Sequence, residues 1–372
     1  MTYTTLLPHP GALTDPRQDD PHRADLPRIA GVGLAVPPTS YTQQEVLDAF
    51  GIEDPRIRSL FLNSAIDRRH LTLPPAGPHG RPVPEEQGAL LAKHKAQGIQ
   101  MGAEAVLGCL AEAGAAIADI GYLCCVTSTG FLTPGLSALL IKELGIDPRC
   151  ARLDVVGMGC NAGLNGLNAT SGWAAANPDR LAVMVCAESC SAAYVFDGTM
   201  RTSVVNSLFG DGAAAVAMTA GQARATGPRL LGFSSCLITD AIDAMRYDWD
   251  SDQARFSFAL EPDVPYVVGA HAERAVDGLL DRAGLRRSEI AHWLVHAGGK
   301  KVVDSVGVNL GLTRYDLRHT TGVLRDYGNL SSGSFLFSFE RLLREGVARP
   351  GEYGVLMTMG PGSTIETALV RF

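Results

Sequence analysis

The chain has 372 residues, of which 46% are hydrophobic and 19% are charged, and it contains 41 glycines. This composition is typical of a tightly packed α/β enzyme. The formal net charge of −7 gives no general attraction for nucleic acid or for an anionic membrane, so we expect neither as a partner. Apolar stretches end well short of the ~20 residues that a membrane span needs, and no secretory leader is recognisable. We therefore expect a cytoplasmic enzyme whose eight cysteines are reduced.

Residues 1–27 are rich in proline and charge, so we expect a disordered or extended N-terminal arm. After the arm, apolar strand patterns alternate with helical periodicity. A Thr cap and a closing glycine mark the first helix. The predicted elements before the middle of the chain, in order, are strand 28–36, helix 42–51, helix 88–115, strand 120–129, helix 135–145, strand 152–159, helix 160–176, strand 180–189 and strand 208–219.

A small, polar segment with Gly and Pro, residues 219–230, is the best candidate for a join between two halves. The second half again shows a long helix, a strand and further helices, and it ends in a hairpin over 354–372. The similar order of elements suggests two related α/β layers that share one core. We therefore predict an α/β fold with halves at 28–220 and 221–372.

Cys160 is the candidate nucleophile. It follows a β-branched strand and two glycines, and it precedes small residues with helical periodicity. At a helix N-terminus, unpaired N–H groups and the helix dipole favour the reactive thiolate. The alternative is a buried packing thiol, which is the expected role of the other cysteines.

Two further residues complete a candidate catalytic trio. His296 ends an apolar strand and precedes AlaGlyGlyLys, and Asn329 follows Gly328 just before a helix. A thiolate needs an imidazole, and a thioester oxyanion needs N–H donors. Alone, His296 could be a surface histidine and Asn329 a helix cap. His292 stands four residues before His296 in a strand, without the Glu of a zinc motif, so we expect no metal.

Six ordered motifs, from Arg28 to Phe372, make the chain resemble the type III polyketide synthases, the chalcone synthase-like family. They are GMGCNAGLNGL, SLFGDGAAAV, FSFALEPDVP, HAGGK, YGNLSS and GPGSTIE. The resemblance implies the thiolase fold, a homodimer, and a tunnel that admits the pantetheine arm of coenzyme A to a buried cavity.

The resemblance also implies roles for individual residues. Cys160 should hold the growing acyl chain, while His296 and Asn329 should assist decarboxylation and stabilise the enolate and oxyanion. Phe209 and Phe258 should form an aromatic gate, although without the resemblance both would be read as core residues. The implied cavity positions are Ser128, Thr129, Cys190, Ala193 and Ser331. The resemblance gives Arg56 as a counterpart of the residues that contact coenzyme A phosphates, while Ser59 and Asn63 stand where plant members carry cations. Lys300 and Lys301 are further candidates as point charges.

The polar arm and the motifs GMGCNAGLN and FSFALEPDVP are most similar to bacterial members that supply antibiotic biosynthesis with a small resorcinol-type aromatic. This similarity implies malonyl-CoA as starter and extender, about four units joined, and no cofactor beyond the coenzyme A thioesters. Helper enzymes acting on the product are a further implied partner. Bacterial members that make tetrahydroxynaphthalene or alkylresorcinols remain alternatives.

Two wider alternatives stay open on the sequence. A β-ketoacyl-carrier-protein synthase of the initiating type shares Cys, His and Asn on the same fold, but its histidine context reads HQAN where this chain has HAGG. A non-catalytic scaffold of the same fold should have lost one member of the trio, whereas all three are present. Labelling of a single reactive thiol would separate an enzyme from a scaffold.

Overall fold

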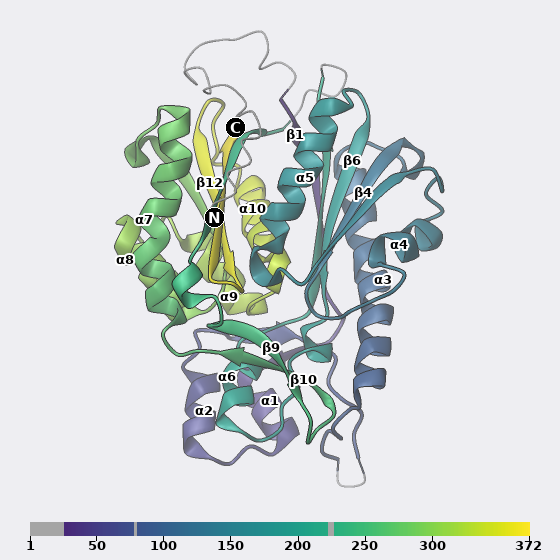
Figure 1. Ribbon diagram of the computed structural model, residues 1–372, viewed down its shortest axis with the longest axis vertical. Coiled ribbons are helices and arrows are strands. Elements are labelled where there is room, and N and C mark those ends of the chain that lie inside the picture. The colour runs from purple at the N-terminus through teal and green to yellow at the C-terminus, as the bar shows by residue number, and fades with distance from the viewer. Residues whose placement is uncertain (1–25, 78–79, 222–226) are drawn as a thin grey trace, which may run out of the picture.

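The computed structural model describes residues 26–77, 80–221 and 227–372, and these form the molecule shown in Figure 1. Most of the predicted N-terminal arm and the centre of the predicted join, residues 222–226, lie outside the described residues. The boundary between the predicted halves therefore stays a prediction. None of the described helices is long and apolar enough to cross a membrane.

A sheet of nine strands runs through the described part of the molecule. From one edge to the other, the strands are β11 (Ile290–Val295), β12 (Tyr353–Gly360), β13 (Thr364–Arg371), β8 (Arg229–Leu237), β1 (Arg28–Ala35), β7 (Gly212–Thr219), β6 (Leu181–Glu188), β4 (Ile120–Thr127) and β5 (Ala151–Val156). Several strands are buried along their whole length and read as continuous apolar runs, as expected of strands covered on both faces.

The two sides of the sheet repeat one pattern of pairing. Strands β1 and β8 meet in the middle, where Arg28 lies opposite Arg229. Outward from β1, the pairing is antiparallel to β7, antiparallel from β7 to β6 and parallel from β6 to β4. Outward from β8, the same succession leads through β13 and β12 to β11. The predicted fold class, α/β with two pseudo-duplicated halves, is confirmed.

Helices complete a layered arrangement. In Figure 1, α5 (Ala162–Ala176) and α10 (Ser334–Glu345) lie between the two sides of the sheet, and both contact strands of each side. Helices α3 (Gln87–Glu112) and α4 (Leu136–Leu144) cover one outer face, while α7 (Val264–Ala283) and α8 (Lys300–Leu310) cover the other. Residues 160–161 and 329–333, which precede α5 and α10, are thereby brought together at the core.

The remaining elements gather mainly at one end of the sheet (Figure 1). They are β2 (Ser40–Thr42), α1 (Gln43–Phe50), α2 (Pro55–Leu62), β3 (Arg68–His70), α6 (Met200–Asn206), β9 (Met245–Asp250), β10 (Arg255–Leu260) and α9 (Arg318–Tyr327). Helix α1 begins with a capping box between Thr42 and Glu45 and ends at the left-handed Gly51, as its sequence predicts.

Three local predictions differ from the structure. The helix predicted from Cys160 begins at Ala162, because Gly159–Asn161 form a 3₁₀ turn first. The strand predicted from 208 begins at Gly212, because Phe209 instead forms an isolated bridge with Asn329. The hairpin of β9 and β10 was not predicted, since only its FSFALEP motif was considered.

Candidate functional site

Cys160 lies in the 3₁₀ turn that connects β5 to α5. Gly159 has a φ of +72°, a left-handed conformation that glycine adopts readily. An added Cβ at Gly163 would overlap the carbonyl oxygen of Ser332, so glycine lets the start of α5 approach residues 331–333. On the other side, a Cβ at Gly360 would lie 3.0 Å from the amide nitrogen of Cys160. The nucleophile is therefore held between α5 and the end of β12.

The Cys160 thiol faces Ser331, with Sγ 3.6 Å from Ser331 Oγ. Burial raises the pKa of Cys160 to about 12, although hydrogen bonds with Ser331 and Asn329 oppose that rise. Loss of hydration therefore outweighs the start of the following helix. A backbone hydrogen bond at Cys160 also lowers its pKa, in the direction predicted for the turn, but burial has the larger effect and keeps the thiol neutral.

His296 follows β11 and is held by its main chain, whose N–H donates to the carbonyl of Met357 at 2.8 Å. The side chain is 2% exposed, and burial lowers the pKa of His296 to about 3. Its Nδ1 has no hydrogen-bond partner among the described residues. The imidazole is therefore neutral. A neutral imidazole is nevertheless free to accept a proton.

Asn329 lies between α9 and α10 and is 2% exposed. Its Nδ2 donates to the carbonyl of Gly298 at 3.3 Å, and its Oδ1 accepts from the N–H of Ser331 at 2.8 Å. Gly298 stands two residues after His296, while Ser331 contacts the Cys160 thiol. Asn329 therefore connects the histidine segment to the cysteine, and all three predicted catalytic residues border one region of the core.

The two predicted gate residues lie close together, with the ring centroids of Phe209 and Phe258 6.4 Å apart. Tyr194 lies beside both rings, with its own centroid 4.1 Å from that of Phe209 and 5.4 Å from that of Phe258. Tyr247 packs against Phe258 at 5.1 Å. Neither tyrosine was predicted as part of the site, because isolated tyrosines in strands and loops carry no signal beyond packing.

The predicted cavity residues differ in their surroundings. Ser128 and Thr129 follow β4, where the N–H of Ser128 and the hydroxyl of Thr129 both reach the carboxylate of Glu188. Cys190 is buried, and Ala193 is half-buried against the same hydrophobic cluster. Glu188 itself was missed, because a single acidic residue at the end of an apolar strand is easily taken for the start of a loop.

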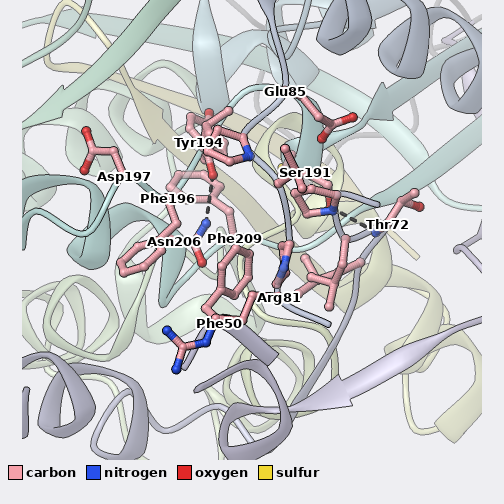
Figure 2. Close-up of a pocket in the computed structure, with 18 of the residues that line it drawn as sticks. Phe50, Thr72, Arg81, Glu85, Ser191, Tyr194, Phe196, Asp197, Asn206 and Phe209 are labelled. Atoms are coloured by element: carbon pink, nitrogen blue, oxygen red, sulfur yellow. Dashed lines mark hydrogen bonds between the residues drawn. The ribbon is translucent and has the colours of Figure 1, made fainter. Parts of the chain in front are cut away.

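A cavity of about 310 Å³ lies behind the aromatic residues. Figure 2 shows Tyr194, Phe209 and Asn206 on one side of it, with Arg81 and Glu85 from the segment before α3. Cys190 also lines this cavity, whereas Cys160, His296 and Asn329 do not. The cavity therefore adjoins the candidate site across Cys190 and Phe209.

The three cations expected to bind coenzyme A phosphates are on the surface. Arg56 lies in the first turn of α2 and pairs with Asp54, its Nη2 lying 3.0 Å from Asp54 Oδ2. Lys300 begins α8 and pairs with Asp304, and Lys301 is exposed beside it. Their role in binding phosphate stays a prediction. Among the described residues, no group of three His, Cys, Asp or Glu is arranged to hold a metal ion.

Comparison with known proteins agrees with this geometry. Residues 86–222 match the N-terminal domain of the chalcone and stilbene synthases, and residues 247–372 match the C-terminal domain. The chain is 68% identical over 348 residues to 3,5-dihydroxyphenylacetyl-CoA synthase of Amycolatopsis balhimycina, covering 94% of each protein. It is 32% identical to 1,3,6,8-tetrahydroxynaphthalene synthase of Streptomyces peucetius, covering 92% of this chain and 93% of that protein.

Solved structures show the same fold. Tetrahydroxynaphthalene synthase of Streptomyces coelicolor, a bacterial type III polyketide synthase, superposes with a TM-score of 0.83 at 27% identity, covering 93% of this chain and 99% of that one. PKS-I of the brown alga Ectocarpus siliculosus gives a TM-score of 0.87 at 25% identity, with 95% and 100% covered. The chain therefore belongs to the chalcone and stilbene synthase family and is a type III polyketide synthase.

Proposed function

We propose that this enzyme condenses about four malonyl-CoA units and cyclises the chain to 3,5-dihydroxyphenylacetyl-CoA, a precursor for dihydroxyphenylglycine in glycopeptide antibiotic assembly. The observation that carries the proposal is the 68% identity to 3,5-dihydroxyphenylacetyl-CoA synthase across 94% of both chains. Identity to the tetrahydroxynaphthalene synthase is only 32%. The polar N-terminal arm and the motifs around Cys160 and Phe258 point the same way.

The roles proposed for the trio follow from its surroundings. Cys160 Sγ attacks the thioester carbonyl of malonyl-CoA while its proton passes to the neutral imidazole of His296, and that proton then leaves with the coenzyme A thiol. Burial disfavours the Cys160 thiolate and the His296 imidazolium when either forms alone. Forming both together lets their attraction offset part of the lost hydration. The amide of Asn329 can then donate to the oxyanion and to the enolate left when CO₂ departs.

We further propose that the enzyme is a homodimer in the cytoplasm. Strand β5 is an edge of the nine-stranded sheet and carries exposed apolar side chains at Leu153 and Val156. Met158, just after β5, and Phe131 are also exposed. An unpaired edge with apolar side chains is a ready surface for a second copy. Sedimentation of the purified protein tests this part of the proposal.

The product assignment is tested with carbon-13 malonyl-CoA as the only acyl donor. The expected product is a resorcinol-type acyl-CoA in which every acyl carbon is labelled. Tetrahydroxynaphthalene would instead support the alternative represented by the more distant bacterial relative. Turnover that appears only after a medium-chain or aromatic acyl-CoA is added would contradict the assignment of malonyl-CoA as starter. No labelling of Cys160 and no turnover with any donor would favour a scaffold.

A further inference from the structure

His94 is a buried histidine that the proposed mechanism does not use. It lies in the first half of α3 and is 0% exposed. Its ring packs directly against Gly130, where any Cβ would overlap the imidazole. Its Nδ1 lies 3.2 Å from Thr129 Oγ1, and its Nε2 has no hydrogen-bond partner among the described residues. The loop after β4 is therefore shaped around this imidazole.

Thr129 connects His94 to a buried carboxylate. Thr129 Oγ1 lies 3.0 Å from Glu188 Oε2 and accepts from the N–H of Ser189 at 2.9 Å. Glu188 Oε2 also accepts from the N–H of Ser128 at 2.9 Å, while the hydroxyl of Ser332 donates to Oε1. Glu188 is 0% exposed, and Ser332 is the neighbour of the Ser331 that contacts Cys160.

The number of protons limits how this network can be arranged. The hydroxyl of Thr129 has one proton and two acceptor positions, and the Ser189 N–H uses one of those positions. If His94 carries its proton on Nδ1, it fills the second position, and the Thr129 proton must point to Glu188. If His94 instead carries its proton on Nε2, the Thr129 proton is drawn to Nδ1 and Glu188 loses a donor. The tautomer of His94 is therefore coupled to whether Thr129 donates to the carboxylate.

We propose that His94 is a positioning residue that acts through Thr129: its Nδ1–H directs the Thr129 hydroxyl onto Glu188 and so maintains a carboxylate charge behind the Cys160 site. The hydrogen bonds from His94 through Thr129 to Glu188 do not depend on which polyketide the enzyme makes. Their effect on malonyl condensation rests on the proposed function. A fixed negative charge there opposes ionisation of the thiol unless His296 becomes charged with it. His94 would thus help to couple the thiolate to the imidazolium.

The pKa of Glu188 depends on each hydrogen-bond donor that contacts its carboxylate. Burial raises the pKa of Glu188, and the hydrogen bonds from Ser332, Ser128 and Thr129 lower it. The titratable groups that interact with Glu188 include Cys160, Cys186, Cys190, Tyr194 and Tyr247, whose pKa values are all raised, so each of these groups is neutral at ordinary pH. Burial also lowers the pKa of His94 to about 4, so the imidazole is neutral and its tautomer matters.

The test compares His94→Asn with His94→Val. Asparagine keeps a donor near the position of Nδ1, whereas valine removes it. His319→Asn is the matched control, because His319 is also buried but bonds to Glu345, away from Glu188. Thermal unfolding shows which variants fold. The readout is the titration of Glu188, followed by carbon-13 NMR in protein labelled at glutamate Cδ and assigned by the signal that Glu188→Gln removes.

In His94→Val the Thr129 hydroxyl loses the Nδ1–H that orients and polarises it, so its hydrogen bond to Glu188 should weaken and the pKa of Glu188 should rise. His94→Asn should restore most of the parent value, and His319→Asn should leave it unchanged. An unchanged Glu188 titration in folded His94→Val would overturn the proposal, as would an equal shift in His319→Asn. Because the NMR experiment needs no substrate, it stands whatever product the enzyme makes.

The pH dependence of turnover tests whether the hydrogen bonds from His94 to Glu188 affect catalysis. The acid limb of the pH–rate profile should move to higher pH in His94→Val, and adding the substitution to Glu188→Gln should produce no further shift. If the shifts of the acid limb caused by His94→Val and by Glu188→Gln add in the double variant, His94 acts by another route, and the coupling through Glu188 is overturned.

Discussion

Replacing His296 by glutamine tests how the nucleophile is activated. Glutamine fills a similar volume and keeps a hydrogen-bonding group, but it cannot take up a proton at neutral pH. Cys160 is then left as a single ionisable group in a buried site. We expect its thiolate to become much rarer, because the charge would form without the imidazolium that accompanies it in the parent enzyme.

The size of the effect follows from burial. Without a charged partner, burial moves the pKa of Cys160 from 9.0 to about 12. A displacement of about three pH units lowers the thiolate fraction about 10³-fold at any pH below the ordinary thiol range. In the parent, proton transfer from Cys160 to His296 avoids part of this loss. Alkylation at Cys160 should therefore be faster in the parent than in His296→Gln, by a large part of this 10³-fold difference in thiolate fraction.

The assay is the rate of iodoacetamide labelling at Cys160, measured by peptide mass spectrometry between about pH 6 and pH 10. Cys160→Ala supplies the background from the other cysteines. In His296→Gln, the rate should be low at neutral pH and should keep rising about tenfold per pH unit to the alkaline end. Identical labelling profiles in His296→Gln and the parent would refute the reasoning, since the imidazole would then contribute nothing to the thiolate.

Three further substitutions test the surroundings of the nucleophile. Asn329→Ala should slow malonyl decarboxylation by ~10²-fold while reducing loading less, as measured by CO₂ release and by mass spectrometry of the loaded enzyme; equal losses in both steps would contradict its role as an oxyanion and enolate donor. Phe258→Leu should enlarge the gate region and give longer or derailed polyketides in product analysis, whereas an unchanged product would show that Phe258 does not limit chain growth. Gly360→Ala should displace the turn at Cys160 and destabilise the fold by about 1–3 kcal/mol with loss of turnover. Gly278→Ala in α7 is the control and should preserve activity, because the nearest atom outside its own helix backbone is 3.8 Å away. Equal stability and turnover of the two variants would show that the approach of β12 to Cys160 is unimportant.

Much of the fold could be predicted because local signals agree with the tertiary structure. The capping box of Thr42 and the left-handed Gly51 are encoded within a few residues of each other. The fully buried strands, such as β4 and β6, appear in the sequence as continuous apolar runs. The trio was predictable because Cys160, His296 and Asn329 each stand where an element begins or ends.

The polar groups behind the site could not be predicted in the same way. His94 lies within a helical pattern, and its hydrogen bond with Thr129 joins residues 35 positions apart in the sequence. Glu188 accepts a hydrogen bond from Ser332, which lies 144 positions away in the sequence. The high pKa of Cys160 could not be predicted, because the start of a helix is visible in the sequence, whereas the loss of hydration depends on all the segments that close over the thiol.

The most direct test of the account is intact-protein mass spectrometry of the enzyme mixed with malonyl-CoA, for the parent and for Cys160→Ala. We expect an acyl adduct on the parent, mapped to Cys160, and none on a folded Cys160→Ala variant, which should also form no polyketide. An adduct at another residue, or chain extension by Cys160→Ala at a rate near that of the parent, would contradict the claim that Cys160 carries the growing chain.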